Sequence, residues 1–142
     1  MEVKLGILSN QMMHASYWFL VLEMMFTTKL QLSGMARSVR QREAACRESA
    51  ITIMNWVMGK GGRLRIADIA KPEYGDEEDF TDEYAVKTIA ALDTWLEQGL
   101  REMLEMVVGK EVEGMEDMLK GVLDKHREFH WDSQAMKNRV FQ

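Results

Sequence analysis

The sequence contains a single proline and a single cysteine among 142 residues. Proline breaks helices and methionine forms them well, so one proline and 13 methionines together favour an all-α protein. Cys46 is the lone cysteine, which excludes an intrachain disulfide and fits a reducing compartment. At this length we expect one domain, residues 1–142, with room for a substantial core.

Long apolar runs are also missing. The most apolar stretch, residues 15–26, has twelve residues and contains Glu23, whereas a membrane-spanning helix needs about 20. The N-terminus MEVKLGILSN has no basic stretch ahead of an apolar one, so we expect no cleavable secretion signal. The sequence therefore predicts an intracellular protein, cytoplasmic or organellar, without membrane insertion.

An excess of positive charge is absent, since 23 acidic residues outnumber 18 basic ones and the net charge is −5. Nucleic-acid-binding proteins usually present a clustered basic face. Here Glu43 and Glu48 interrupt the densest basic stretch, which consists of Arg37, Arg40, Arg42 and Arg47. This stretch is typical of a solvated helix face, and we expect no nucleic-acid partner.

Negative charge is concentrated in one insert. Residues 73–84, EYGDEEDFTDEY, hold seven acids and no base, which leaves the rest of the chain near +2. Two interpretations stay open. The insert is either a solvated loop or a contact for cations or a basic partner, which the aromatic residues Tyr74, Phe80 and Tyr84 would support.

Four segments have apolar residues at alternating steps of three and four, which predicts amphipathic helices. They span about residues 3–27, 30–58, 80–108 and 110–140. The inward positions of the second segment are polar or small in the middle, at Arg42, Cys46 and Ser49. Either this helix is partly exposed there, or an interior polar site once occupied that level.

The link between the second and third segments is unusually long, about residues 59–79. It begins GKGGRLRIADIAKP, with two adjacent glycines and the one proline. Extended chain covers about 3.3 Å per residue and helix 1.5 Å, so such a link can return the length of the bundle. Short first and third links with a long second one predict a four-helix bundle with one crossover.

The crossover sequence GGRLRIADIAKP resembles the corresponding segment of eukaryotic ferritins. HASYWFL, REAACRESA and ALDTWLEQGL are similar to the first three helices of that family, and the resemblance covers essentially the whole chain. It implies a ferritin-like bundle. It also implies a subunit of a larger homo- or hetero-oligomer, in which Leu64, Ile66 and Ile69 of the crossover would contact a second subunit.

The resemblance also implies where a ferroxidase site would lie. The family binds two irons through a helix-one glutamate, a Glu-x-x-His pair, a helix-three glutamate and a helix-four glutamine. The matching positions here are Met12, Cys46, Ser49, Glu97 and Trp131. One ligand of five is retained, and we expect the bulky Trp131 to fill space that an ion needs. These positions therefore predict a degenerate site, no enzyme activity, and no cofactor.

Other features of the family are also altered. The sequence ends at Gln142, near the predicted end of the fourth helix, so we expect no fifth helix. Glu97 and His126 could form a remnant metal site. The alternatives are a carboxylate paired with a basic side chain and a hydrogen-bonded core histidine.

Three functions follow from these observations. The first is a catalytically inactive ferritin-like subunit with a structural or protein-interaction role. The second is a non-catalytic subunit that co-assembles into an iron-storage shell. The third is a divergent binder of a metal or small ligand through Glu97 and His126.

Overall fold

A computed structural model describes residues 1–110 and 112–140. Its elements are four long helices, α1 (Glu2–Thr28), α2 (Ser33–Gly59), α3 (Asp82–Val107) and α4 (Met115–Val140), and a short 3-10 helix, η1 (Glu77–Asp79). No strand occurs in these residues. The predicted all-α fold is confirmed. The predicted domain also included residues 111, 141 and 142, which lie outside the described part.

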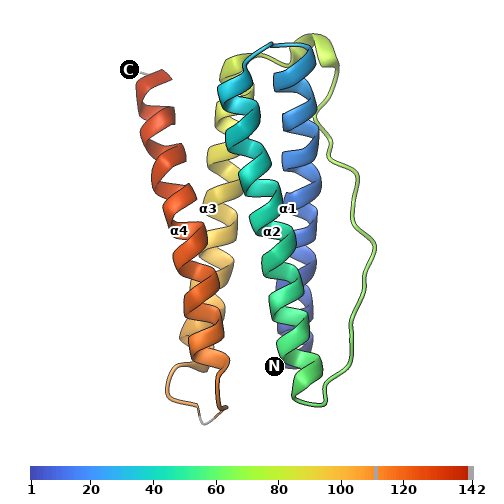
Figure 1. The fold of residues 1–142 in the computed structure, drawn as a ribbon, viewed down its shortest axis with the longest axis vertical. Coiled ribbons are helices and arrows are strands. Elements are labelled where there is room, and N and C mark those ends of the chain that lie inside the picture. The colour runs from blue at the N-terminus through green and yellow to red at the C-terminus, as the bar shows by residue number, and fades with distance from the viewer. Residues whose placement is uncertain (111, 141–142) are drawn as a thin grey trace.

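α1 and α2 form one antiparallel helix pair, α3 and α4 form a second, and one long crossover connects the two pairs (Figure 1). α1 packs mainly against α2, and α3 packs mainly against α4. After α2 the chain returns along the outside of the bundle, so that α2 and α3 run in the same direction. This is the predicted four-helix bundle with one crossover.

The core consists of the inward residues of all four helices. Each fully buried large apolar side chain contributes about 1.5–3 kcal/mol relative to exposure, so this core accounts for much of the drive to fold. The large apolar side chains with almost no exposed surface include Phe19, Phe26, Ile53, Ile89, Leu100 and Leu119.

Three helices begin later than predicted, α3 by two residues at Asp82. α4 begins at Met115, five residues late, because Gly109 and Gly114 adopt positive φ angles of 80° and 85° in the preceding link. Such angles suit glycine and are incompatible with a continuing helix. α2 begins at Ser33, three residues late, after Gln31 with a φ of 53°.

The acidic insert is anchored to the bundle by its aromatic residues. Phe80 is buried in the core, and its ring lies 6.4 Å from Tyr74 and 5.2 Å from Tyr84. The acids at residues 76–79 are exposed. Thr81 then caps α3 by accepting a hydrogen bond from the backbone N–H of Tyr84 at 3.2 Å. Phe80 therefore serves internal packing with Tyr74 and Tyr84 half-buried against it, while the acids at 76–79 face outward.

Within the described residues, no helix combines the length and the apolar character needed to span a bilayer.

Candidate functional site

Arg42 of α2 forms an ion pair in the centre of the bundle. Its Nε lies 3.0 Å from Oδ2 and 3.3 Å from Oδ1 of Asp93 on α3. The two side chains are 1% and 2% exposed. Burial raises the pKa of the Asp93 carboxyl, and the neighbouring Arg42, Ser133 and His130 only partly offset this effect. Asp93 and Arg42 therefore depend on each other for charge compensation inside the bundle.

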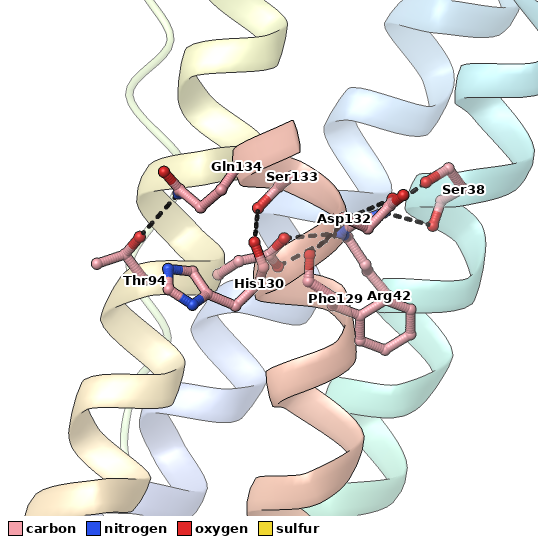
Figure 2. Close-up of polar contacts among 9 residues, drawn as sticks. Ser38, Arg42, Thr94, Phe129, His130, Asp132, Ser133 and Gln134 are labelled. Atoms are coloured by element: carbon pink, nitrogen blue, oxygen red, sulfur yellow. Dashed lines mark hydrogen bonds and ion pairs between the residues drawn. The ribbon is translucent and has the colours of Figure 1, made fainter. Parts of the chain in front are cut away.

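The remaining N–H groups of the Arg42 guanidinium are also used (Figure 2). Nη1 donates to the backbone oxygen of Ser38 at 3.3 Å and to its hydroxyl. Nη2 donates to the backbone oxygen of Phe129 at 3.2 Å and to Oδ2 of Asp132 at 3.3 Å. The Phe129 ring lies 5.0 Å from the guanidinium carbon. The Arg42 guanidinium therefore joins α2, α3 and α4. A buried charge is tolerated when it is paired and its donors are hydrogen-bonded, and Arg42 meets both conditions.

Two turns along α2, Ser49 meets His126 of α4. The Ser49 hydroxyl and His126 Nε2 are 3.0 Å apart, and both side chains are buried. Burial, assisted by the charge of Lys125, lowers the pKa of His126 to about 4. The imidazole is therefore neutral near pH 7 and acts as a hydrogen-bonded core residue.

Cys46 lies on α2 between Arg42 and Ser49 and is fully buried. Burial raises the pKa of its thiol, and the nearby carboxylates Asp93 and Glu43 raise it further. The thiolate is the form that binds metals. Cys46 is therefore a protonated core residue and a poor metal ligand.

Glu97 of α3 is surrounded by basic side chains. It forms ion pairs with Arg101, one turn along α3, and with Arg127 of α4, whose Nε lies 4.0 Å from Glu97 Oε1. Nδ1 of His130 also contacts Glu97 Oε2. The two atoms lie close together, but no aligned hydrogen bond reaches Nδ1. Glu97 is thus the paired carboxylate that one of the two sequence interpretations described.

The arginine stretch does not form a single solvated face. Arg40 is exposed beside Glu23, and Arg47 is exposed beside Glu43. The prediction of a solvated face is wrong for Arg42, which points inward to Asp93. The polar middle of α2 is therefore an interior polar site and not an exposed stretch.

Outside the bundle, the crossover borders a largely apolar hollow of about 420 Å³ between itself and the surfaces of α1 and α2. Leu64 is exposed, Ile66 is 84% exposed, and Ile69 is half-buried. We call this the crossover groove, and it is lined by these three residues with Ile51, Met54 and Met58. The three crossover residues predicted to contact a second subunit thus lie together on one accessible surface.

Comparisons with known proteins identify the fold. No protein-family model matches the sequence, and no curated protein does either. Among solved structures, a humanized archaeal ferritin matches with a TM-score of 0.83 at 18% identity, covering 98% of this chain and 83% of the other. An open-pore ferritin from the hyperthermophilic archaeon Archaeoglobus fulgidus matches with 0.82 at 15%, covering 98% and 83%. A closed form of that ferritin, engineered by mutagenesis, also gives 0.82 at 15%, covering 98% and 82%.

The chain has the ferritin fold. At these identities the likeness concerns the arrangement of the backbone, and the chemistry must be judged from the side chains.

The resemblance placed five positions at the ferroxidase site, and four of them face the interior of this ferritin fold. Met12, Cys46, Ser49 and Glu97 are buried, whereas Trp131 is 65% exposed. The expectation that Trp131 fills the interior is therefore wrong. The inward positions of α4 are His126 and residues 130 and 133. Trp131 follows residue 130, and each residue of a helix is rotated about 100° from the one before it, so Trp131 points away from the interior.

His130 occupies the inward position instead and was missed from the sequence. Its spacing of four from His126 and three from Ser133 is the signal that could have found it. Asp93 was also missed, although it lies four residues from both Ile89 and Glu97 on the inward side of α3.

The donor set at these positions does not fit a di-iron centre. Such a centre needs several hard oxygen ligands and imidazoles that converge. Here one carboxylate, Glu97, is already held by basic side chains, and His126 is held by Ser49. Across the described residues, no group of three or more histidine, cysteine, aspartate or glutamate side chains is arranged to hold a metal ion.

Proposed function

We propose that this chain is a catalytically inactive ferritin-like subunit with a structural or protein-interaction role within a larger assembly. The observation that carries the proposal is the buried Arg42–Asp93 pair. Its guanidinium lies one turn along α2 from Cys46, which matches a ferroxidase ligand position, and its charge acts on the Cys46 thiol. The negative charge of Asp93 acts on the same thiol, but this carboxylate is held by Arg42 and could bind an incoming iron cation only by leaving the buried guanidinium without its partner.

The state of Glu97 supports the same proposal. To bind iron(II), Glu97 would have to leave Arg101, Arg127 and His130. Glu97 is buried but Arg101 and Arg127 are partly exposed, so leaving them costs less than the roughly 3–5 kcal/mol of a fully buried pair, yet more than an exposed pair costs. Met12 and Ser49 offer no strong hard donors in return.

Iron oxidation tests this part of the proposal. Purified protein mixed aerobically with iron(II) should oxidise it no faster than buffer, while an active ferritin chain run in parallel should accelerate it. Saturable oxidation that scales with protein concentration would overturn the reading of Met12, Cys46 and Ser49. Lysine in place of Glu97 (Glu97→Lys) should leave the rate at the buffer value as well.

The assembly part of the proposal rests on the crossover groove. An exposed apolar surface that includes Ile66 at 84% and Leu64 is unusual for a surface that stays in water. A second copy of the chain, turned about a two-fold axis, would cover both crossovers at once, because such an interface uses the same patch on each subunit.

A second candidate is a non-catalytic subunit of an iron-storage shell, which the ferritin fold and its intact crossover favour. Chromatography with light scattering separates the two candidates. The chain is measured alone and after refolding with an active ferritin chain. A defined small oligomer in both samples supports the first candidate, and a closed shell that contains this chain supports the second. A monomer in both samples would exclude both assembly proposals.

A further inference from the structure

A second groove lies between α1 and α3, on surfaces that neither the interior site nor the crossover groove uses. It has a volume of about 680 Å³. The aromatic groove, as we call it, is lined by His14, Trp18, Glu73, Tyr84, Lys87 and Trp95. Its volume is within the range of about 300–1,000 Å³ that is usual for binding sites.

Aromatic side chains dominate this lining. The rings of His14 and Trp95 lie 5.8 Å apart in an edge-to-face arrangement, which holds the indole of Trp95 in place. Trp95 is nevertheless 41% exposed, and Trp18 and Tyr84 are only partly buried. Indole and phenol faces attract cations within about 6 Å, and arginine and lysine are the protein groups that use them.

The charge around the groove has one dominant sign. Glu73 and Tyr84 both line the groove, and they are the first and last residues of the acidic insert. The sequence of the insert contains seven acids and no basic residue. The groove also contains Lys87, and Glu83 pairs with its ammonium at 3.2 Å. The neighbourhood is therefore strongly negative, and a positive partner would be attracted to it.

We propose that the aromatic groove and the acidic insert together dock a lysine- or arginine-bearing segment of another protein. One basic side chain lies against Trp95, Trp18 and Tyr84 and pairs with Glu73, while further basic residues face the exposed acids at 76–79. A small cation is less well matched, because half-exposed walls would not enclose it and one charge would leave most of the insert unpaired.

This inference is independent of the proposed function. The aromatic groove lies beside α3, and the residues that line it are different from those of the crossover groove. A failure to bind basic peptide would leave the iron and assembly results unchanged, and the reverse also holds.

The test uses the full chain and a fluorescein-labelled short peptide of alternating lysine and glycine. Fluorescence anisotropy should show saturable binding that weakens as salt is raised, because exposed charges are screened. A matched peptide with glutamate in place of lysine should not bind. Tetramethylammonium, added as a competitor, should displace the lysine peptide only at far higher concentration than unlabelled lysine peptide does.

Two exposed positions supply the variants. Trp95→Leu keeps an apolar side chain but removes the aromatic face, and it should weaken binding roughly two- to five-fold. Glu73→Gln should weaken it by a similar factor of roughly two to five. The matched controls Trp131→Leu and Glu105→Gln, both at exposed positions that do not line the groove, should bind as the parent does.

Several results would overturn the proposal. These are no saturable binding of the lysine peptide, equal binding of the glutamate peptide, and parent-like binding by both Trp95→Leu and Glu73→Gln. Tight binding of tetramethylammonium by itself would instead assign a small organic cation to the groove. If Trp95→Leu changes the oligomeric state in light scattering, the groove is covered by a second copy and the proposed partner is wrong.

Discussion

The inside of the bundle and the outside of the crossover differ in how they relate to the ferritin fold. Inside, the ligand positions carry Met12, Cys46 and Ser49, and a buried arginine lies beside them. Outside, the crossover presents exposed apolar residues of the kind that a second subunit could cover. The ferritin fold is thus present without a group of side chains, among the described residues, that is arranged to hold a metal ion.

The two regions also contribute differently to stability. A buried charge that loses its partner is penalised by desolvation, whereas an exposed apolar residue that is replaced costs almost nothing in the folded monomer. Substitutions in the interior should therefore change folding, and substitutions on the crossover should change association. The following predictions are ordered by their expected effect on the free energy of unfolding.

Arg42→Met should have the largest effect. It leaves Asp93 buried without its cation, and we expect the free energy of unfolding to fall by about 3–5 kcal/mol, measured by urea denaturation. Arg40→Met serves as the control, because Arg40 is exposed beside Glu23 and its loss should cost less than about 1 kcal/mol.

Combining Arg42→Met with Asp93→Leu sharpens this test. Replacing both members of a buried pair by apolar residues is often neutral or stabilising, so the double variant should regain most of the lost stability. If the double variant is no more stable than Arg42→Met, the pair is not the unit that stabilises this level of the bundle.

The fold was predictable from the sequence because its signals are repetitive. Apolar steps of three and four recur through each helix, and one long link among short ones allows few topologies. The start of α4 was harder to predict, because the positive φ of Gly114 depends on the geometry of the turn and produces no periodic pattern in the sequence.

The candidate site was predictable only in part. The positions taken from the ferritin resemblance correctly placed Met12, Cys46 and Ser49 in the buried interior of the bundle. The pairing of Arg42 with Asp93 was not found, because two charges 51 residues apart meet only when the folded bundle turns the inward sides of α2 and α3 toward its centre. Trp131 was misplaced because a single-residue error in helical register rotates a side chain by about 100°.

Protonation of His126 should have the next largest effect. Its folded-state pKa is lowered to about 4, below its usual value of 6.5, so the unfolded chain binds the proton more tightly. The stability of the parent should therefore be full above about pH 6.5 and fall as the pH drops toward 4, by about 2–3 kcal/mol. Urea denaturation at a series of pH values measures the decline.

His126→Gln isolates this contribution, since glutamine can still bond to Ser49 but does not titrate. The raised pKa of Asp93 acts in the opposite direction, because protonation of that carboxyl favours the folded state as the pH falls. It is present in both proteins and cancels in the difference. Identical pH profiles for the parent and His126→Gln would show that His126 is not held neutral by burial.

Thr81→Ala tests the junction where the crossover enters α3. The Thr81 hydroxyl accepts a hydrogen bond from the Tyr84 N–H at 3.2 Å, and losing such a cap costs about 1 kcal/mol. Thermal denaturation should show a correspondingly lower melting temperature. Thr28→Ala, at the other end of a helix where the hydroxyl bonds only to the preceding turn, should change it less.

Ile66→Lys should have the smallest effect on folding and a large one on association. At 84% exposure the side chain contributes little to the monomer, so the free energy of unfolding should change by less than about 0.5 kcal/mol. A lysine at the centre of an apolar interface has to be desolvated without a partner, and the dimer dissociation constant should rise at least about ten-fold. Analytical ultracentrifugation over a concentration series measures this.

Trp131→Lys introduces the same charge at an exposed site on α4 and should leave association unchanged, because α4 does not border the crossover groove. If both variants associate as the parent does, the crossover is not a subunit contact, and the contrast between an altered interior and a retained interface fails.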